Sequence, residues 1–401
     1  MHLHKLITTD FSFEAGGSLD QLEIIYHTSP RAYKEGERVV WLCHALTANS
    51  DPLDWWPEMV GEGCCVNPDK DFVVCVNIFG SAYGTTGPRS MVKNGVELGR
   101  IGKNGKNGVE LGRIEKNGKN GVELGRIGKN GVELYSEEGT TLHHSTQQLH
   151  HSTQLPHNPT PLDFPKFTVR DTARLFTIVR EHLGIKQVDL LVGSSIGGFH
   201  ALEWAIMEGD VIQRAAFIAT APRVSPWLSA WMEVQRMAME ADPTFRTCES
   251  LDSGRKGLEA ARAISLISYR SFDGYNLTQY ETDDDCLFAS RAASYERYQG
   301  EKLVKRGFDA YSYYYLLHCV DSQNVGRKRG GVAKALAQIT AKSIVISITS
   351  DGLFPPAESR EWAKHIPAAK YYEIESRFGH DGFLLETEQI TQIINSLEVK
   401  G

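Results

Sequence analysis

VDLLVGSSIGGF, at residues 188–199, decides the fold. The apolar run at its start is typical of a buried strand, and a helical pattern begins at Phe199. Between them lies a G-x-S-x-G motif centred on Ser195. Glycines on both sides suit a sharp strand-to-helix turn, because side chains there would collide with neighbouring backbone. Such a turn exposes the Ser195 hydroxyl at the sheet edge. A glycine-rich phosphate-binding turn, or an ordinary tight turn, is the alternative.

The same alternation of strand and helix continues on both sides of this stretch. Further Val- and Ile-rich runs are too short for helices and predict buried strands. Helical patterns such as 171–183 lie between several of them. This order predicts a mostly parallel sheet flanked by helices, and together with the G-x-S-x-G turn it predicts an α/β-hydrolase fold. The further predicted strands are Val39–Cys43, Phe72–Ile78, Ala215–Ala219, Ser343–Ile348 and Tyr371–Ile374.

Residues 225–331 break the alternation, since they contain many helical periods and aromatic residues but no convincing strand. We expect a helical cap, inserted between two strands over the edge of the sheet where ligands bind. A peripheral helical appendage is the alternative. The predicted α/β-hydrolase core then comprises residues 1–91, 161–224 and 332–401.

Residues 92–160 form a second break. NGVELGRI occurs at 94–101, 107–114 and 120–127, and LHHSTQ occurs at 142–147 and 149–154. Packed structural repeats are usually more degenerate than these copies, and each copy offers little apolar surface to offset chain ordering. We therefore expect a mobile, low-complexity surface insertion, with stacked hairpins or a small solenoid as the alternative. The repeat itself explains the clustered histidines, so we expect no metal site.

Two further residues complete a possible catalytic triad. Serine is a poor nucleophile until a base takes its proton. In this fold the acid and then the histidine follow the serine along the chain, each just past a strand. Asp351 and His380 occupy those two places. We predict that His380 accepts the Ser195 proton and that Asp351 orients the imidazole.

Backbone N–H groups are expected to stabilise the oxyanion. The Ile196 amide follows the nucleophile, and the Leu46 amide lies in the loop after an early strand. His44, in the same loop, is expected to be structural because His380 already fills the position of the base.

At this point the sequence resembles a specific family, the homoserine O-acyltransferases, in their acetyltransferase branch. The resemblance covers most of the chain outside the repeats, and its blocks distinguish this family from esterases and lipases. The sequence differs from the family after Gly87-Pro88. In the family a short connection joins this point to the stretch that matches 164–171, and here the repeat segment replaces that connection. The matching blocks are HALTANSDPLDWW (44–56), VNIFGSAYGTTGP (76–88), GSSIGGFHALEW (193–204), APRVSPWLSAWMEVQRMAMEADPTF (221–245), SDGLFPP (350–356) and GHDGFLLE (379–386).

The resemblance implies further roles. Arg262 and Tyr269 match the cap residues that hold the homoserine carboxylate, and Asp381 matches the carboxylate that faces its amino group. It implies acetyl-CoA as co-substrate with no permanently bound cofactor, an acetyl-Ser195 intermediate, transfer to L-homoserine for methionine biosynthesis, and a homodimer joined through the cap helices. The remaining alternatives are a succinyl-CoA-dependent or other hydroxy-amino-acid acyltransferase, and a serine hydrolase.

The composition of the chain bears on its binding partners and its cellular location. The 401 residues carry a formal net charge of −7, and no basic stripe outside the repeats suggests a nucleic-acid partner. No apolar run approaches the length of a membrane span, and the N-terminus lacks the apolar core of a secretory signal. The seven cysteines are an odd number, and several lie in apolar runs, where a reduced thiol packs as a small apolar side chain. Reduced thiols are typical of a reducing compartment. We therefore expect a cytoplasmic protein that does not bind membranes.

Overall fold

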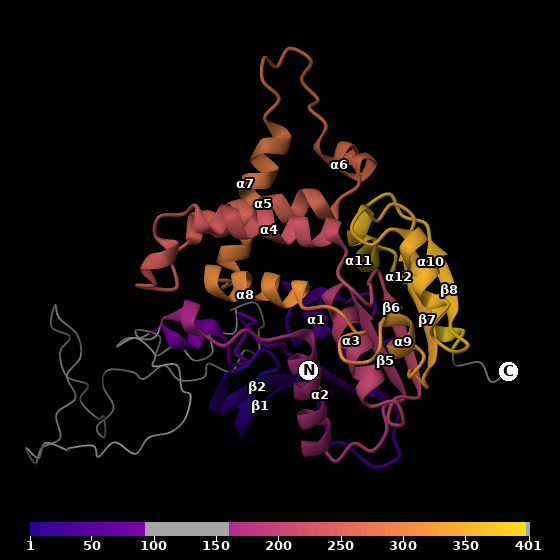
Figure 1. Ribbon diagram of the computed structural model, residues 1–401. Helices are drawn as coiled ribbons and strands as arrows, with labels where there is room; N and C mark the ends of the chain where they lie inside the picture. The colour runs from indigo at the N-terminus through magenta and orange to yellow at the C-terminus, as the bar shows by residue number, and fades with distance from the viewer. Residues whose placement is uncertain (93–159, 398–401) are drawn as a thin grey trace, which may run out of the picture.

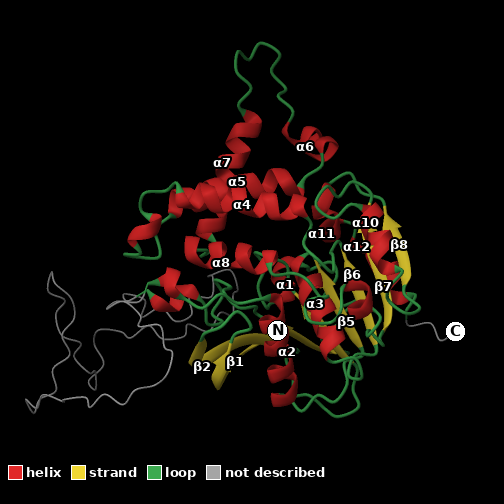
Figure 2. Cartoon of the chain, viewed as in Figure 1, coloured by secondary structure: helices red, strands yellow, loops and turns green. Residues whose placement is uncertain are grey.

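The computed structural model describes residues 1–92 and 160–397. Apart from its two end residues, the predicted repeat insertion at 92–160 lies outside the described residues. In the described part, eight strands form a single sheet (Figure 2). The strands, in spatial order, are β1 (His2–Ser12), β2 (Ser18–Thr28), β4 (Phe72–Val76), β3 (Val39–Cys43), β5 (Leu190–Ser194), β6 (Arg214–Ile218), β7 (Lys342–Ile348) and β8 (Lys370–Ile374).

The sheet is parallel from β4 to β8, and an antiparallel hairpin of β1 and β2 extends it at one edge. The predicted α/β-hydrolase fold is thus confirmed. All six strands predicted from apolar runs are present, although β5 starts two residues later than expected. The hairpin was not predicted, because β1 is largely exposed and its residues lack a continuous apolar run.

Helices cover both faces of the sheet, and alternate strand residues enter two separate hydrophobic clusters. Val39, Trp41 and Cys43 face the cluster that contains α2 (Val169–His182), α3 (Ile196–Met207) and α10 (Pro356–Ala363). Val40 and Leu42 face the other cluster, with α11 (Gly382–Leu385) and α12 (Thr387–Asn395). Because both faces are buried, the central strands are continuously apolar rather than alternating.

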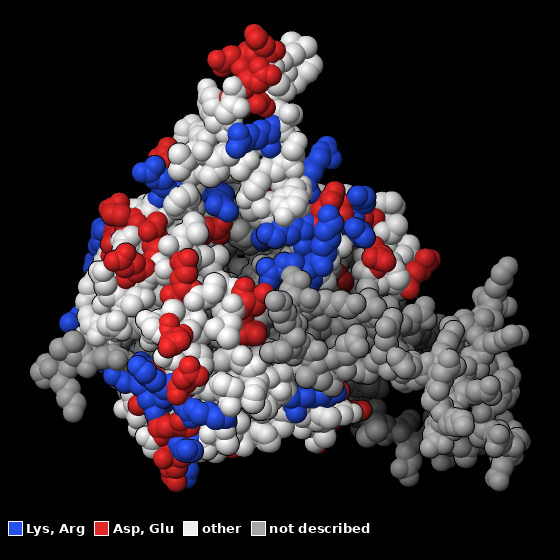
Figure 3. All heavy atoms as spheres, turned by 180° about the vertical axis from the view of Figure 1, so that it is seen from behind, with Lys and Arg blue, Asp and Glu red and all other residues white. Residues whose placement is uncertain are grey.

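Helices fill the chain between β6 and β7, and they lie above the sheet in Figure 1. A segment at 280–290 projects from this cap, and Figure 3 shows acidic side chains at its tip. They come from Glu281 and residues 283–285. The expected helical cap between two strands is therefore present, while the exact domain boundaries stay a prediction. The cap helices are α4 (Pro226–Glu240), α5 (Arg255–Tyr269), α6 (Phe272–Gln279), α7 (Arg291–Lys305) and α8 (Ala310–Asp321).

Shorter elements complete the described chain. Within residues 1–92 and 160–397, no helix is long and apolar enough to cross a bilayer, and no three His, Cys, Asp or Glu side chains are grouped to hold a metal ion. The short elements are α1 (Pro52–Trp55), α9 (Val332–Leu336) and the 3-10 turns η1 (Pro88–Met91), η2 (Pro161–Asp163), η3 (Phe245–Thr247) and η4 (Gly379–Asp381).

Candidate active site

Ser195 occupies the turn between β5 and α3, and its backbone is strained, with φ 55° and ψ −128°. The Ser195 N–H donates to the carbonyl of Ile218 at 3.0 Å, and the Thr220 hydroxyl donates to the Ser195 carbonyl at 2.9 Å. These contacts fix the serine against the end of β6, so the strain is maintained by its surroundings.

The glycines of the motif are required by close packing. A Cβ atom on Gly193 would lie 2.4 Å from the Gly197 carbonyl oxygen, and one on Gly197 would lie 2.1 Å from the Cys43 carbonyl oxygen. Real Cβ atoms are not found at such distances. The turn at Ser195 is therefore pressed directly against the loop that follows β3.

Ser195, His380 and Asp351 are joined by two hydrogen bonds. The Ser195 hydroxyl lies 2.8 Å from His380 Nε2, and His380 Nδ1 lies 2.8 Å from Asp351 Oδ2. A carboxylate only accepts, so Nδ1 carries the proton and Nε2 accepts from the serine. The parallel strands β5, β7 and β8 all end at this edge of the sheet, which brings together residues far apart in sequence.

Backbone donors hold Asp351 in place. Its Oδ1 atom accepts from the N–H groups of Leu353 at 2.8 Å and Phe354 at 3.0 Å, while Oδ2 accepts from His380 Nδ1. The neighbouring Ser350 hydroxyl accepts from the Gly379 N–H at 2.9 Å and links the loops after β7 and β8. The carboxylate is thus nearly buried with each oxygen hydrogen-bonded.

The electrostatic surroundings of His380 favour its charged form. Burial opposes the charge on the imidazole, but the charge and hydrogen bond of Asp351, helped by the charge of Asp381, outweigh it and raise the pKa of His380. A base of raised pKa holds a proton more firmly once it has accepted it. This suits a group that must carry a proton briefly between two oxygen atoms.

The two predicted oxyanion donors lie on adjacent elements. Ile196 is the first residue of α3, so its N–H has no partner within the helix. Leu46 lies in the loop after β3 that abuts Gly197. His44 braces this loop: one ring nitrogen donates to the Ala45 carbonyl at 2.9 Å, and the other accepts from the Ile78 N–H at 3.3 Å.

Burial lowers the pKa of His44 to about 4, so its ring is neutral near pH 7. A neutral ring with one donor and one acceptor is satisfied by these two contacts. The geometry therefore agrees with the expected structural role.

Tyr269 and Asp381 adjoin His380, and Arg262 lies over Tyr269; their predicted contacts with homoserine stay a prediction. The Arg262 guanidinium lies 5.6 Å from the Tyr269 ring centroid, and the Tyr269 ring lies 5.9 Å from that of His380. Asp381 directly follows His380, and its Oδ2 atom forms an ion pair with Arg270 Nε at 2.9 Å. Within the described residues, Arg262 has no carboxylate within 4 Å.

Arg270 was missed by the sequence reasoning. Its only signal is its place next to Tyr269, at the C-terminal end of α5. Burial raises the pKa of Asp381, against the positive charges of Arg270, His380 and Arg262, which lower it. Arg270 is thus the cation in direct contact with Asp381, the carboxylate next to His380.

The chain is similar in sequence to known proteins over most of its length. The family model of the alpha/beta hydrolase fold matches residues 38–387. A homoserine O-acetyltransferase from Cyclobacterium marinum is 34% identical over 393 residues, which cover 97% of this chain and 93% of that protein.

Solved structures support the fold. A homoserine O-acetyltransferase from Bacillus anthracis superposes with a TM-score of 0.74 at 18% identity, covering 100% of this chain and 98% of that one. An acetylester hydrolase from Corynebacterium glutamicum gives 0.72 at 17% identity, covering 99% and 95%. Transferases and esterases thus share this architecture, so function depends on the site rather than on the fold.

Proposed function

The chain belongs to the homoserine O-acetyltransferase family of the α/β-hydrolase fold, and we propose that it transfers an acetyl group from acetyl-CoA to the hydroxyl of L-homoserine. The observation that carries this proposal is the hydrogen-bonded chain from Ser195 through His380 to Asp351. Acetyl-CoA acts as a co-substrate, and the scheme requires no permanently bound cofactor.

In the first half-reaction, His380 Nε2 takes the proton of Ser195 as the serine oxygen attacks the thioester carbonyl. The N–H groups of Ile196 and Leu46 stabilise the negative charge that develops on the carbonyl oxygen. The carbon–sulfur bond breaks, the proton passes from His380 to the departing sulfur, and free CoA leaves. The product on the protein is an acetyl ester on Ser195.

In the second half-reaction, the homoserine hydroxyl gives its proton to His380 and attacks the acetyl carbonyl. The ester bond to Ser195 breaks, and His380 returns the proton to the serine oxygen. O-acetylhomoserine leaves, and the free enzyme is restored. The two products leave in separate steps, which gives ping-pong kinetics.

The acceptor is proposed to bind between the cap and the triad. The Arg262 guanidinium, next to Tyr269, suits the homoserine carboxylate, since a planar fork of donors matches a carboxylate. Asp381 is proposed to face the amino group. Its position beside His380, and the lack of a carboxylate contact at Arg262 among the described residues, support both assignments.

The first test is release of free thiol from acetyl-CoA and succinyl-CoA, with and without L-homoserine, by the wild type and Ser195→Ala. We expect release from acetyl-CoA that requires homoserine and disappears in the variant. Preference for succinyl-CoA would indicate a different acyl donor. Equal release without any acceptor would indicate a hydrolase and contradict the proposal.

We also propose that a second copy of the chain docks on the cap. Leu287 and Phe288, in the projecting segment at 280–290, are 85% and 80% exposed, and Phe272, at the start of α6, is 81% exposed (Figure 1). Large apolar side chains that are this exposed on one part of a protein are typical of an interface. Light scattering should give a dimer mass for the wild type and a lower mass for Phe288→Asp. A monomeric wild type at micromolar concentration would contradict this proposal.

A further inference from the structure

Glu296 is a carboxylate in the cap that the proposed mechanism does not use. It lies on α7, and its Oε1 atom accepts a short hydrogen bond from the Tyr275 hydroxyl on α6. Its Oε2 atom is shielded from solvent and has no hydrogen-bond partner among the described residues. A buried carboxylate oxygen without a donor is costly, so this atom is suited to receive one from a ligand.

The charges around Glu296 belong to the acceptor region of the site. Burial raises the pKa of Glu296, while the Tyr275 hydrogen bond and the positive charges of Arg262 and Arg270 lower it. Arg270 also lies 3.5 Å from the hydroxyl of Tyr295, the residue before Glu296 on α7. The packing of α5 against α7 therefore brings Glu296 within electrostatic reach of Arg262, which lies over Tyr269, and of Arg270, which pairs with Asp381.

Four charged groups lie in this region, and two of them form an ion pair with each other. The four are Arg262, Arg270, Asp381 and Glu296. Arg270 and Asp381 form an ion pair at 2.9 Å. Among the described residues, no carboxylate lies within 4 Å of Arg262 and no cation lies within 4 Å of Glu296. One guanidinium and one carboxylate are thus left without a direct counter-charge. An α-amino acid carries the two complementary charges on one carbon atom.

Resting on the proposed function, we propose that Glu296 accepts a charge-assisted hydrogen bond from the ammonium group of the acceptor, whose carboxylate binds Arg262. Asp381 faces the same ammonium group but shares its Oδ2 atom with Arg270, so Glu296 supplies a second carboxylate whose Oε2 atom is still available. The site thereby selects hydroxy-amino acids over hydroxy acids. Without the ammonium group, the buried Oε2 atom stays without a donor, and this penalises the wrong acceptor.

The test compares L-homoserine with 4-hydroxybutyrate, which keeps the hydroxyl and carboxylate but lacks the ammonium group. The wild type is expected to prefer homoserine. In Glu296→Gln the KM for homoserine should rise by about tenfold to a hundredfold, the loss expected for one hydrogen bond to a charged group. The rate with 4-hydroxybutyrate and the acetylation of Ser195 by acetyl-CoA should not change.

Glu301→Gln is the matched control, because Glu301 lies on the same helix but is half-exposed and pairs with Lys305. Glu296→Met provides a second variant that keeps side-chain length without the charge, and it should lose the same discrimination. Thermal unfolding of each variant checks that it is folded.

Three results separate the ideas. If wild-type protein transfers no acetyl group to homoserine, the proposed function fails. If it does, but Glu296→Gln keeps the wild-type preference for homoserine, only the role of Glu296 is overturned. An equal fall with both acceptors would indicate a purely structural role for Glu296 and would overturn the inference as well.

Discussion

His380 lies between two carboxylates that act on it unequally. Asp351 is hydrogen-bonded to it and raises its pKa most, while Asp381 adds a smaller charge effect in the same direction. His380 must be neutral to accept the serine proton. Activity is therefore expected to fall as the pH drops through this raised pKa.

Asp381→Asn should move that acid limb to lower pH, because it removes one of the charges that favour imidazolium. The measurement is kcat/KM for acetyl-CoA as a function of pH, which reports the free enzyme. Glu386→Gln, a half-buried change between α11 and α12, should leave the profile as it is. An acid limb that stays in place or moves upward in Asp381→Asn would contradict the prediction.

At the scale of elements, the serine turn and the loop after β3 form one packed unit. A Cβ atom at Gly197 would lie 2.1 Å from the carbonyl oxygen of Cys43 and 2.9 Å from that of His44. Backbone cannot move away as a flexible side chain can. Alanine at this position must therefore displace the loop that carries the Leu46 amide.

Gly197→Ala is expected to lower the free energy of unfolding by about 1–3 kcal/mol, as overpacking typically does. It should also lower kcat by about a hundredfold or more, because misplacing a reacting group by about 1 Å has that effect. Chemical denaturation and thiol release measure the two. Gly352→Ala is a sharp control: it adjoins Asp351, yet a Cβ there meets nothing within 4 Å. Equal behaviour of the two variants would refute this account of the turn.

The elements differ in how far sequence predicts them. Central strands such as β3 and β7 are buried on both faces, so their apolar runs identify them. The triad follows from those strands, because each member lies just past one. β1 has no such apolar run, since it is an exposed edge strand held mainly by pairing with β2.

The contacts of Arg270 and Glu296 could not be predicted in the same way. They depend on how α5 packs against α7 and against η4, and sequence periodicity does not specify that packing. Arg262 and Tyr269 were found only through the family resemblance, since on spacing alone they suit a solvated face and a core position.

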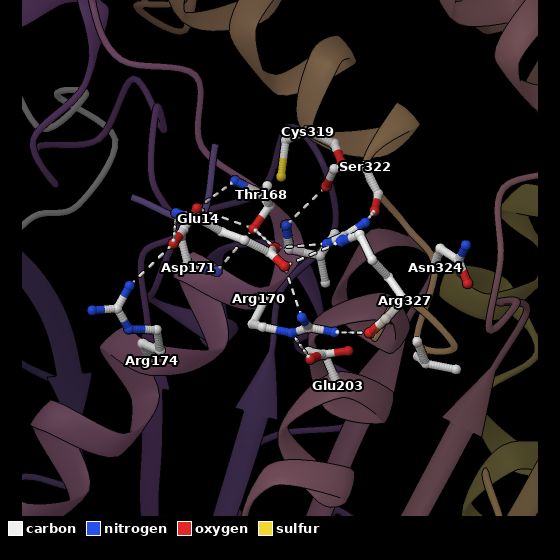
Figure 4. Close-up of polar contacts among 12 residues, drawn as sticks. Glu14, Thr168, Arg170, Asp171, Arg174, Glu203, Cys319, Ser322, Asn324 and Arg327 are labelled. Atoms are coloured by element: carbon white, nitrogen blue, oxygen red, sulfur yellow. Dashed lines mark hydrogen bonds and ion pairs between the residues drawn. The ribbon is translucent and has the colours of Figure 1, made fainter. Parts of the chain in front are cut away.

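At the scale of the whole molecule, an ion-pair network joins parts of the chain that are far apart in sequence (Figure 4). Glu203 on α3 is only 2% exposed and contacts Arg170 of α2 at 2.5 Å and Arg329 at 2.7 Å. Glu14, in the loop between β1 and β2, contacts Arg170 and Arg327, each at 2.7 Å. The network therefore ties the N-terminal hairpin and the core helices to the segment that returns from the cap.

This network bears on the active site because α3 begins directly after Ser195. Glu203→Gln would leave Arg329 facing a neutral amide and Arg170 with Glu14 as its remaining carboxylate. Breaking a buried ion pair by removing one partner typically costs about 3–5 kcal/mol. We expect the unfolding midpoint in urea to fall accordingly. The acetylation rate of the protein that remains folded should change little, since Glu203 does not contact the triad.

The matched control for Glu203→Gln is Glu361→Gln on α10. Glu361 pairs with Lys364, but both side chains are largely exposed, at 71% and 60%. Water and salt screen such a pair, so its loss should leave the unfolding midpoint unchanged. If Glu203→Gln unfolded at the wild-type midpoint, the network would not hold the cap return to the core. The cap would then depend on its apolar contacts alone, and the proposed acceptor site would keep its geometry without these ion pairs.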